Sequence, residues 1–132
     1  MEPIPAYVQM PETLTLVSSG MIDSRYLNVL KKICSVKDEV ISSWLNINVK
    51  TFRSYKKSSL ELSPDVQEHT VMLLSLMKHG IDVFGSKEAF SQWLERENVS
   101  LDGSSPSGYL NTVSGIKFID DRLSGMEYGD NA

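Results

Sequence analysis

Residues 81–132 read IDVFGSKEAFSQWLERENVSLDGSSPSGYLNTVSGIKFIDDRLSGMEYGDNA. In the second half of this stretch, apolar residues recur every three or four positions, at Val113, Ile116, Ile119, Leu123 and Met126. This spacing predicts an amphipathic helix, and Thr112 just before it can cap the first turn. An earlier helix, at about residues 87–95, is predicted by the apolar face of Ala89, Phe90, Trp93 and Leu94. The stretch therefore predicts a small helical module with a free C-terminal tail, in which Phe118 lies off the apolar stripe and is exposed.

The longest predicted helix precedes this module, at about residues 64–84. Ser63-Pro64-Asp65 is typical of a helix start, because it supplies a cap, a proline for the first turn and an acid. Apolar residues follow on so many sides that the helix must lie in the middle of the fold or at a dimer interface. With 132 residues and 41% apolar residues, the chain can form one domain or two tightly packed subdomains around a real core.

A basic segment lies upstream of the long helix. Helical spacing predicts short helices at about residues 24–34, 37–45 and 49–57, with the tight turn Asn46-Ile47-Asn48 before the last one. The last helix leaves mainly basic and hydroxyl side chains outside. Two short helices of this kind are typical of a helix-turn-helix, whose Lys and Arg side chains neutralise DNA phosphates. The alternative is an ordinary three-helix bundle with a solvated basic face.

The first twenty residues are the least informative. Pro3, Pro5 and Pro11 lead us to expect no helix there. Residues 13–17 alternate weakly, which allows a short strand, an extended arm packed on a neighbour, or a flexible arm.

Charge is distributed unevenly along the chain. The net charge of −4 combines −3 over residues 1–24, +6 over residues 25–57 and −7 over residues 58–132. Such a split indicates a polyanionic partner for the middle segment and a less acidic protein for the C-terminal segment. Chance segregation in a short chain is the alternative.

Several function classes lack the residues they need. The single cysteine, Cys34, lies in an apolar helical pattern, which predicts a small buried residue and an intracellular, cytoplasmic location. His69 and His79 have no acid cluster near them in the sequence, so we expect surface or core-edge histidines, no metal site and no cofactor. The longest apolar run, residues 71–77, is too short to cross a bilayer, and residues 1–12 do not form a secretory signal. Without a nucleophile–base pair, phosphate loop or metal-ligand spacing, an enzyme is not expected.

A set of short motifs, in order and at matching spacing, resembles a known family. They are Gly20-Met21-Ile22, Lys50-Thr51-Phe52, Leu62-Ser63-Pro64-Asp65, Val83-Phe84-Gly85, Ala89-Phe90, Trp93-Leu94, Leu101-Asp102-Gly103, Pro106, Leu110-Asn111-Thr112, Gly115 and Glu127-Tyr128-Gly129. From about residue 19 to 132 the chain resembles the Xre/MbcA/ParS group of type II antitoxins. The recognition helix departs from the family, because Phe52-Arg53-Ser54-Tyr55 stands where relatives commonly have Leu and a run of Arg. Asp130 also gives the tail a charge that not every relative has.

The resemblance implies an all-α fold: an N-terminal helix-turn-helix bundle joined by a long central helix to a small C-terminal toxin-binding module. It implies an N-terminal arm over residues 1–18, an Xre-like DNA-binding region over residues 19–62, and a toxin-binding domain over residues 63–132 that is also a candidate for dimerisation. The expected partners are a RES-domain toxin that consumes NAD, operator DNA and a second copy of the chain. The antitoxin would cover the toxin's active-site cleft with its C-terminal end and repress its own operon.

The resemblance also places candidate contact residues. Those expected to face DNA are Lys50, Thr51, Arg53, Ser54 and Lys56. Those expected to face the toxin are Phe118, Arg122, Glu127, Tyr128, Gly129, Asn131 and Ala132. Two alternatives stay open: Tyr128 packs back on the last helix, or the chain is a stand-alone transcriptional regulator whose C-terminal module only dimerises.

Overall fold

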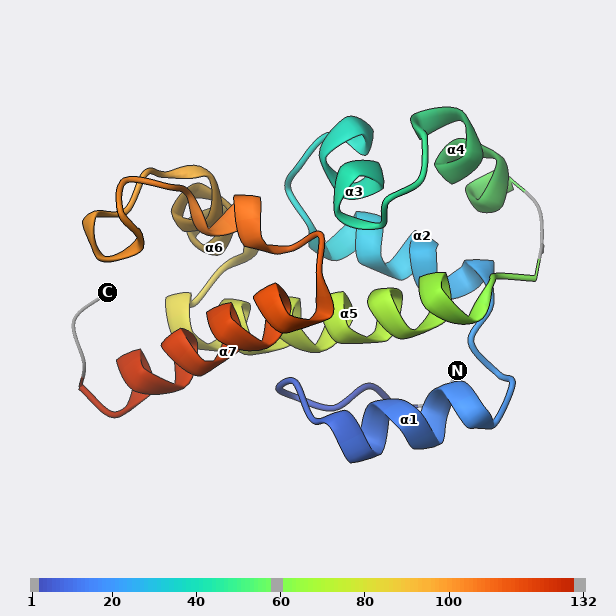
Figure 1. Cartoon of the computed structure of the whole chain (residues 1–132), viewed down its shortest axis with the longest axis horizontal. Helices are drawn as coiled ribbons and strands as arrows, with labels where there is room; N and C mark the ends of the chain where they lie inside the picture. Colours follow the sequence, from blue (N-terminus) through green and yellow to red (C-terminus); the bar gives the residue numbers. More distant parts are fainter. Residues whose placement is uncertain (1–2, 58–60, 130–132) are drawn as a thin grey trace.

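The computed structural model describes residues 3–57 and 61–129, and over these residues the chain is all-α, as expected (Figure 1). Its elements in chain order are α1 Met10–Ser18, α2 Ser24–Ile33, α3 Asp38–Trp44, α4 Val49–Lys57, α5 Pro64–Phe84, α6 Lys87–Glu95, the 3-10 turns η1 Val99–Leu101 and η2 Pro106–Tyr109, and α7 Val113–Glu127.

Helix α5 is the axis of the fold. Residues 69–77 are all buried, and the helix packs against α1, α2, α6 and α7. Ser63 caps its start by accepting a hydrogen bond from the Val66 N–H. Gly85 ends it in the left-handed region at φ 88°, a conformation that favours glycine. The helix thus lies in the middle of the fold, one of the two places that its apolar character predicts.

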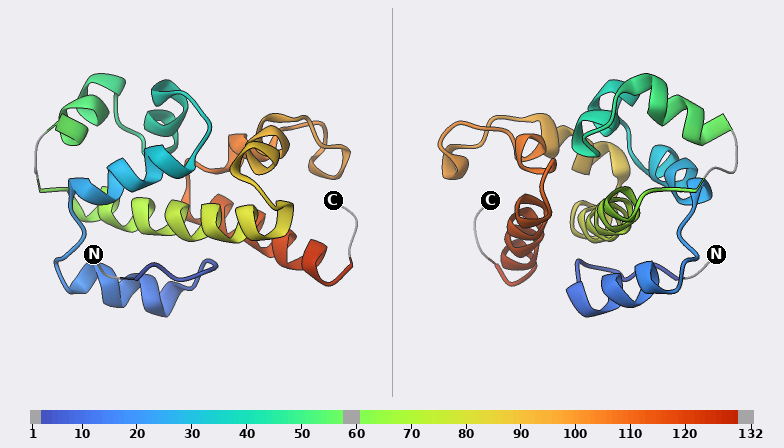
Figure 2. Two further views of the ribbon diagram at one scale, coloured as in Figure 1. Left: turned by 180° about the vertical axis from the view of Figure 1, so that it is seen from behind. Right: turned by 45° about the vertical axis from the view of Figure 1, so that its right-hand side comes forward.

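The remaining helices surround α5 in two groups (Figures 1 and 2). Helices α2, α3 and α4 cover one end of α5, and α6 with η1 and η2 lies on the same side at the other end. Helix α1 lies on the opposite side, and α7 runs beside the second half of α5. As a result, α4 and the end of α7 lie at opposite ends of the molecule.

The expectation that prolines exclude a helix near the N-terminus is wrong. Helix α1 begins at Met10 with Pro11 in its first turn, where the missing N–H costs nothing because it would have no partner within the helix. The buried Thr13 packs α1 into the core, and its hydroxyl donates to the Gln9 carbonyl at 2.9 Å. Ahead of the helix, the Ile4 carbonyl accepts a hydrogen bond from Lys78 of α5 at 2.7 Å.

The turn between α3 and α4 needs no glycine. Asn46 takes the left-handed conformation at φ 57°, which asparagine tolerates better than most residues. Its side-chain amide donates to the Asn111 carbonyl at 2.9 Å, and the Trp44 indole N–H donates to the Ser107 carbonyl at 3.1 Å. These bonds connect the predicted helix-turn-helix to the C-terminal module. A boundary between residues 62 and 63 stays a prediction, since α5 contacts helices from both halves.

Predicted helix starts and the predicted cysteine environment are confirmed. Asp23, Ser86 and Thr112 each accept a backbone N–H bond at the start of α2, α6 and α7. Cys34 is buried, and its burial raises the pKa of the thiol to about 12.

Candidate functional site

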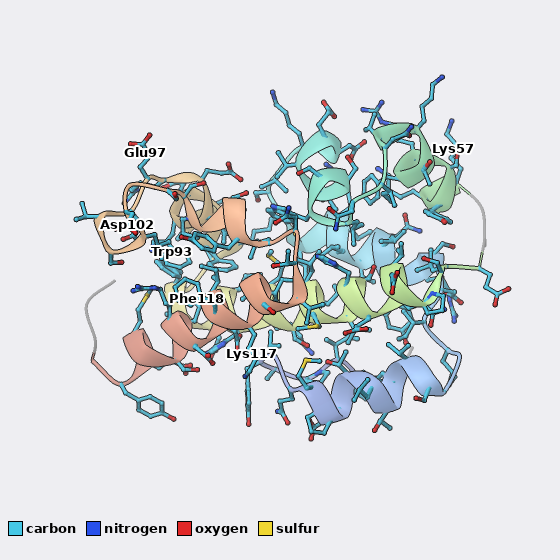
Figure 3. All side chains as sticks on the ribbon, viewed as in Figure 1. Lys57, Trp93, Glu97, Asp102, Lys117 and Phe118 are labelled. Atoms are coloured by element: carbon cyan, nitrogen blue, oxygen red, sulfur yellow. The ribbon has the colours of Figure 1, made fainter. Side chains whose placement is uncertain are left out.

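One face of α7 presents an aromatic ring and a guanidinium group together. The apolar stripe of α7 turns Ile116, Ile119 and Leu123 into the core, which leaves Phe118 and Arg122, one turn apart, on a neighbouring face. Phe118 is 41% exposed, as expected, and lies on the side of α7 near α6, whereas Lys117 points away (Figure 3).

Two contacts hold this face in place. The ring of Phe118 lies 5.3 Å from the ring of Tyr109 in η2, and the Arg122 guanidinium lies 5.3 Å from the Phe118 ring centre. Arg122 also donates to the Ser100 carbonyl at 3.0 Å and to the Ser100 hydroxyl at 3.2 Å. The structure therefore brings together two of the predicted toxin-facing residues on a surface whose side chains are already ordered.

The end of α7 presents Tyr128 to solvent. Tyr128 is 88% exposed, so it does not pack back on the last helix. Its backbone N–H donates to the Ser124 and Gly125 carbonyls, and Gly129 then takes φ 96°. The predicted contacts Asn131 and Ala132 lie outside the described residues.

Glu127 binds within the molecule. Its carboxylate pairs with Nε2 of His79, while Nδ1 of the same imidazole lies 2.7 Å from the Asp120 carboxylate. The Val8 N–H also donates to Asp120, at 3.3 Å. We call His79, Asp120 and Glu127 the His79 cluster. His79 and Asp120 are each only 5% exposed at the side chain, whereas Glu127 is 40% exposed.

The charge of the His79 cluster follows from its geometry. An ionised carboxylate only accepts hydrogen bonds, so when Asp120 and Glu127 are both ionised the imidazole between them donates from both nitrogens and carries a positive charge. Burial opposes this charge, but the hydrogen bonds to Asp120 and Glu127 outweigh it, and the pKa of His79 lies above its usual value.

Both histidines are buried rather than at the surface, and His79, unlike His69, has acid partners. His79 is buried between two carboxylates, and His69 is buried with Nε2 2.8 Å from the Leu110 carbonyl. The acids were missed because they lie 41 and 48 residues from His79 in the sequence. Asp120 and Glu127 are seven residues apart, two helical turns, and that spacing was the available signal.

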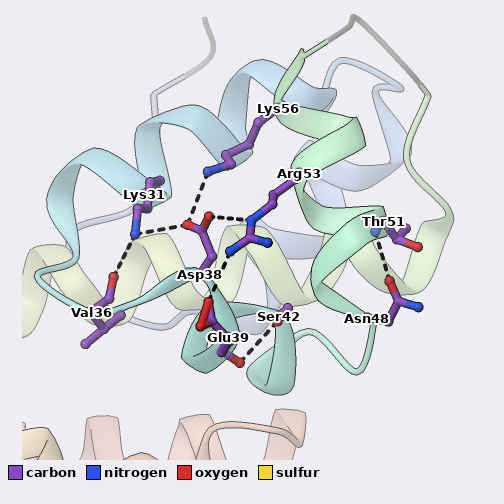
Figure 4. A network of polar contacts seen from close by, with 9 residues as sticks. All are labelled: Lys31, Val36, Asp38, Glu39, Ser42, Asn48, Thr51, Arg53 and Lys56. Carbon is purple, nitrogen blue, oxygen red and sulfur yellow. Dashed lines mark hydrogen bonds and ion pairs between the residues drawn. The ribbon is translucent and has the colours of Figure 1, made fainter.

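Helix α4 carries the predicted DNA-facing residues, and they fall into two groups. Lys50, Thr51 and Ser54 are exposed on the outer side of the helix. Arg53 and Lys56 turn instead toward Asp38 in the first turn of α3, with nitrogen–oxygen distances of 3.1 and 3.2 Å (Figure 4).

Asp38 is the centre of an ion-pair network. It also pairs with Lys31 of α2 at 3.0 Å, and Arg53 reaches Glu39 at 3.3 Å. Hydrogen bonds from Lys31, and then from Arg53 and Lys56, hold the pKa of Asp38 well below its usual value. A surface hollow of about 660 Å³ beside the network is lined by Asn28, Lys31, Lys32, Asp38, Arg53, Lys56 and Lys57. The hollow is basic, with one acid that pairs three of its cations.

The described residues contain neither a metal-binding cluster nor a membrane-spanning helix. Across residues 3–57 and 61–129, no group of three or more His, Cys, Asp and Glu side chains is arranged to hold a metal ion. None of the helices in the same ranges has both the length and the apolar character needed to cross a membrane.

Residues 79–129 match the family model described as the antitoxin Xre/MbcA/ParS C-terminal toxin-binding domain. Over these residues, the C-terminal module is similar to the toxin-binding domain of that antitoxin family. No curated protein matched the chain. The antitoxin resemblance is thereby confirmed for the C-terminal module.

The matched domain spans the end of α5 and all of α6, η1, η2 and α7. Two glycines allow its helices to pack closely. A Cβ on Gly80 would lie 2.2 Å from the Phe90 ring, and one on Gly115 would lie 1.7 Å from the Tyr109 carbonyl oxygen. Phe118, Arg122, Glu127 and Tyr128 all lie within this domain, whereas α4 lies outside it.

Proposed function

We propose that this antitoxin neutralises a RES-domain toxin, an enzyme that consumes NAD, by covering its active-site cleft with the Phe118 face and the segment that starts at Tyr128. The observation that carries the proposal is Tyr128, which is 88% exposed directly after the last helix of a toxin-binding domain. The antitoxin acts by binding, with no catalytic step of its own.

The chemistry of these residues suits a protein interface. Tyrosine and arginine are the residues that most often dominate binding energy, because they combine a large contact area with hydrogen-bonding groups. Arg122 is already held by Ser100 and Phe118, so less of its side-chain entropy is lost on binding. Tyr128 adds a large apolar face with few rotatable bonds.

We further propose that the antitoxin represses its own operon through α4 and binds DNA as a homodimer. The exposed Lys50 and Thr51 support direct contacts to phosphates or base edges. Arg53 and Lys56 would join them when a phosphate oxygen replaces the Asp38 carboxylate. Because α4 and the end of α7 lie at opposite ends of the molecule, one chain has room to bind DNA and toxin together (Figure 1).

The first experiment is co-expression of the antitoxin with the RES-type protein encoded beside it, followed by co-purification and an NAD-depletion assay. A stable complex with suppressed NAD loss is expected. Removal of residues 128–132, which leaves the His79 cluster in place, should weaken neutralisation but not operator binding. The double variant Lys50→Ala/Arg53→Ala is the complementary control, because it should weaken operator binding and leave toxin neutralisation unchanged.

Two outcomes would contradict the proposal. Full neutralisation by the shortened chain would show that the segment after Glu127 does not contact the toxin. No complex with the neighbouring protein, together with intact operator binding, would favour the stand-alone regulator, for which the exposed basic side of α4 is the supporting observation.

A further inference from the structure

The His79 cluster lies where the toxin-facing segment leaves the fold. Glu127 is the last residue of α7, and Tyr128 follows it immediately. A carboxylate bound to a buried imidazole cannot move freely, so the contact with His79 restricts the backbone from which Tyr128 projects. His79 belongs to α5, the most buried helix of the fold, and is itself a rigid anchor.

Residues ahead of α1 close the cluster from the other side. The Val8 N–H donates to Asp120, and the Tyr7 ring lies 6.0 Å from the His79 ring. Lys78, next to His79, donates to the Ile4 carbonyl at 2.7 Å and holds this segment against α5. We call residues 4–8 the N-terminal strap. The strap lies outside the residues that match the toxin-binding domain.

We propose that the His79 cluster, closed by the N-terminal strap, is a clasp that positions the toxin-binding segment, with Glu127 acting through His79 rather than on the toxin. This inference rests on the proposed function for its effect on toxin affinity, but the order of residues 127–129 can be measured without toxin. His79 and Asp120 are positioning residues.

The clasp depends on the charge of the imidazole. The groups that face His79 are the Asp120 and Glu127 carboxylates from α7 and the Tyr7 ring from the strap. When the imidazole loses its proton, it keeps one N–H and can satisfy only one carboxylate. Glu127 is the more exposed of the two, so water replaces its bond first and the segment is released.

The size of the effect follows from the entropy of the released backbone. Fixing one residue costs about 1–2 kcal/mol, which corresponds to about fivefold to thirtyfold in affinity. Release of Glu127 and Tyr128 should therefore weaken toxin binding by at least that factor. His79 itself is buried in the fold, so this loss would not come from a direct contact between His79 and the toxin.

The test compares Glu127→Gln and His79→Gln with the control Asp121→Asn by ¹⁵N relaxation of the full chain. Asp121 is a matched control because it lies on the same helix, its side chain is 68% exposed, and its partner Lys117 is 4.0 Å away. Both cluster variants should lower the heteronuclear NOE of the Tyr128 and Gly129 amides, and the control should not. In the wild type, the His79 imidazole and the Tyr128 amide should titrate with one shared midpoint.

Toxin affinity then separates the clasp from direct contact. If Glu127 acts through His79, the two single variants and the double variant should lose similar amounts of affinity, because the second change removes nothing more. Loss in Glu127→Gln alone would overturn the clasp and make Glu127 a direct toxin contact. Unchanged NOE values in both cluster variants would also overturn it. If the wild type binds no toxin, the proposed function fails, but the NOE values and the shared titration midpoint still test the clasp. If His79→Gln does not fold, the Glu127→Gln NOE values and the wild-type titration test it instead.

Discussion

Tyr128→Ala is the sharpest test of the proposed toxin surface. A buried tyrosine covers about 150–250 Å², and at about 25 cal/mol per Å² of apolar area this sets an upper limit of about 4–6 kcal/mol. Since Tyr128 is 88% exposed in the free chain, nearly all of its area is available to a partner. Truncation of interface hot spots costs about 2–4 kcal/mol, so we expect the dissociation constant to rise by roughly 30-fold to 1,000-fold.

The assay is binding of the proposed toxin by titration calorimetry, with thermal unfolding of the free chain measured beside it. The unfolding temperature should not change, because the tyrosine ring makes few contacts in the free chain. Val99→Ala is the matched control: Val99 is 95% exposed in η1 of the same domain and is not a predicted contact. A Tyr128→Ala dissociation constant equal to that of the control variant would refute the assignment.

Three further predictions concern the fold, its pH dependence and DNA binding. Gly80→Ala places a methyl group 2.2 Å from the buried Phe90 ring. Urea unfolding should therefore show a loss of about 1–3 kcal/mol in the free energy of unfolding, which exceeds the gain in helix propensity. Gly108→Ala, where the added methyl group meets open space, is the control, and equal stability of the two variants would refute the close packing. The pKa of His79 is raised in the folded state. The stabilisation that His79 contributes is therefore complete below its unfolded pKa of about 6.5, and is lost as pH rises through its folded pKa. The difference in unfolding temperature between wild type and His79→Gln should be larger at about pH 6 than at about pH 9, and a constant difference would contradict this. Asp38→Asn removes the carboxylate that Lys31, Arg53 and Lys56 share, and leaves Arg53 its pair with Glu39. Operator affinity should therefore rise, and the slope of log K against log salt should steepen by about 1 or more. An unchanged slope would mean that these cations do not reach phosphate.

Local signals predicted the helices well. Cap residues such as Ser63 and Thr112 predict helix starts, because a side-chain oxygen next to a free N–H is a local interaction that needs no tertiary partner. The exposure of Phe118 follows in the same way from the helical period. The same local reasoning failed for α1, where counting prolines mattered less than their place in the first turn.

The candidate sites were predicted less completely. The helix-turn-helix pattern placed Lys50 and Arg53 on the same outer face. Both are exposed, but the Arg53 side chain turns aside to pair with Asp38. Asp38 pairs with Lys31, Arg53 and Lys56. Its three cationic partners come from two other helices, and no spacing in the sequence records such contacts.

The sequence by itself determined the all-α class, most helix starts, the membership of the C-terminal module in a toxin-binding family, and the position of Tyr128 just beyond the last helix. These features depend on neighbours within about two helical turns, or on motifs in linear order. Only the tertiary structure decided that Glu127 pairs with His79 and that the N-terminal strap bonds to Asp120. Those contacts join residues 48 and 112 positions apart, and they exist because packing α7 and the strap on α5 buries polar groups that must then find partners.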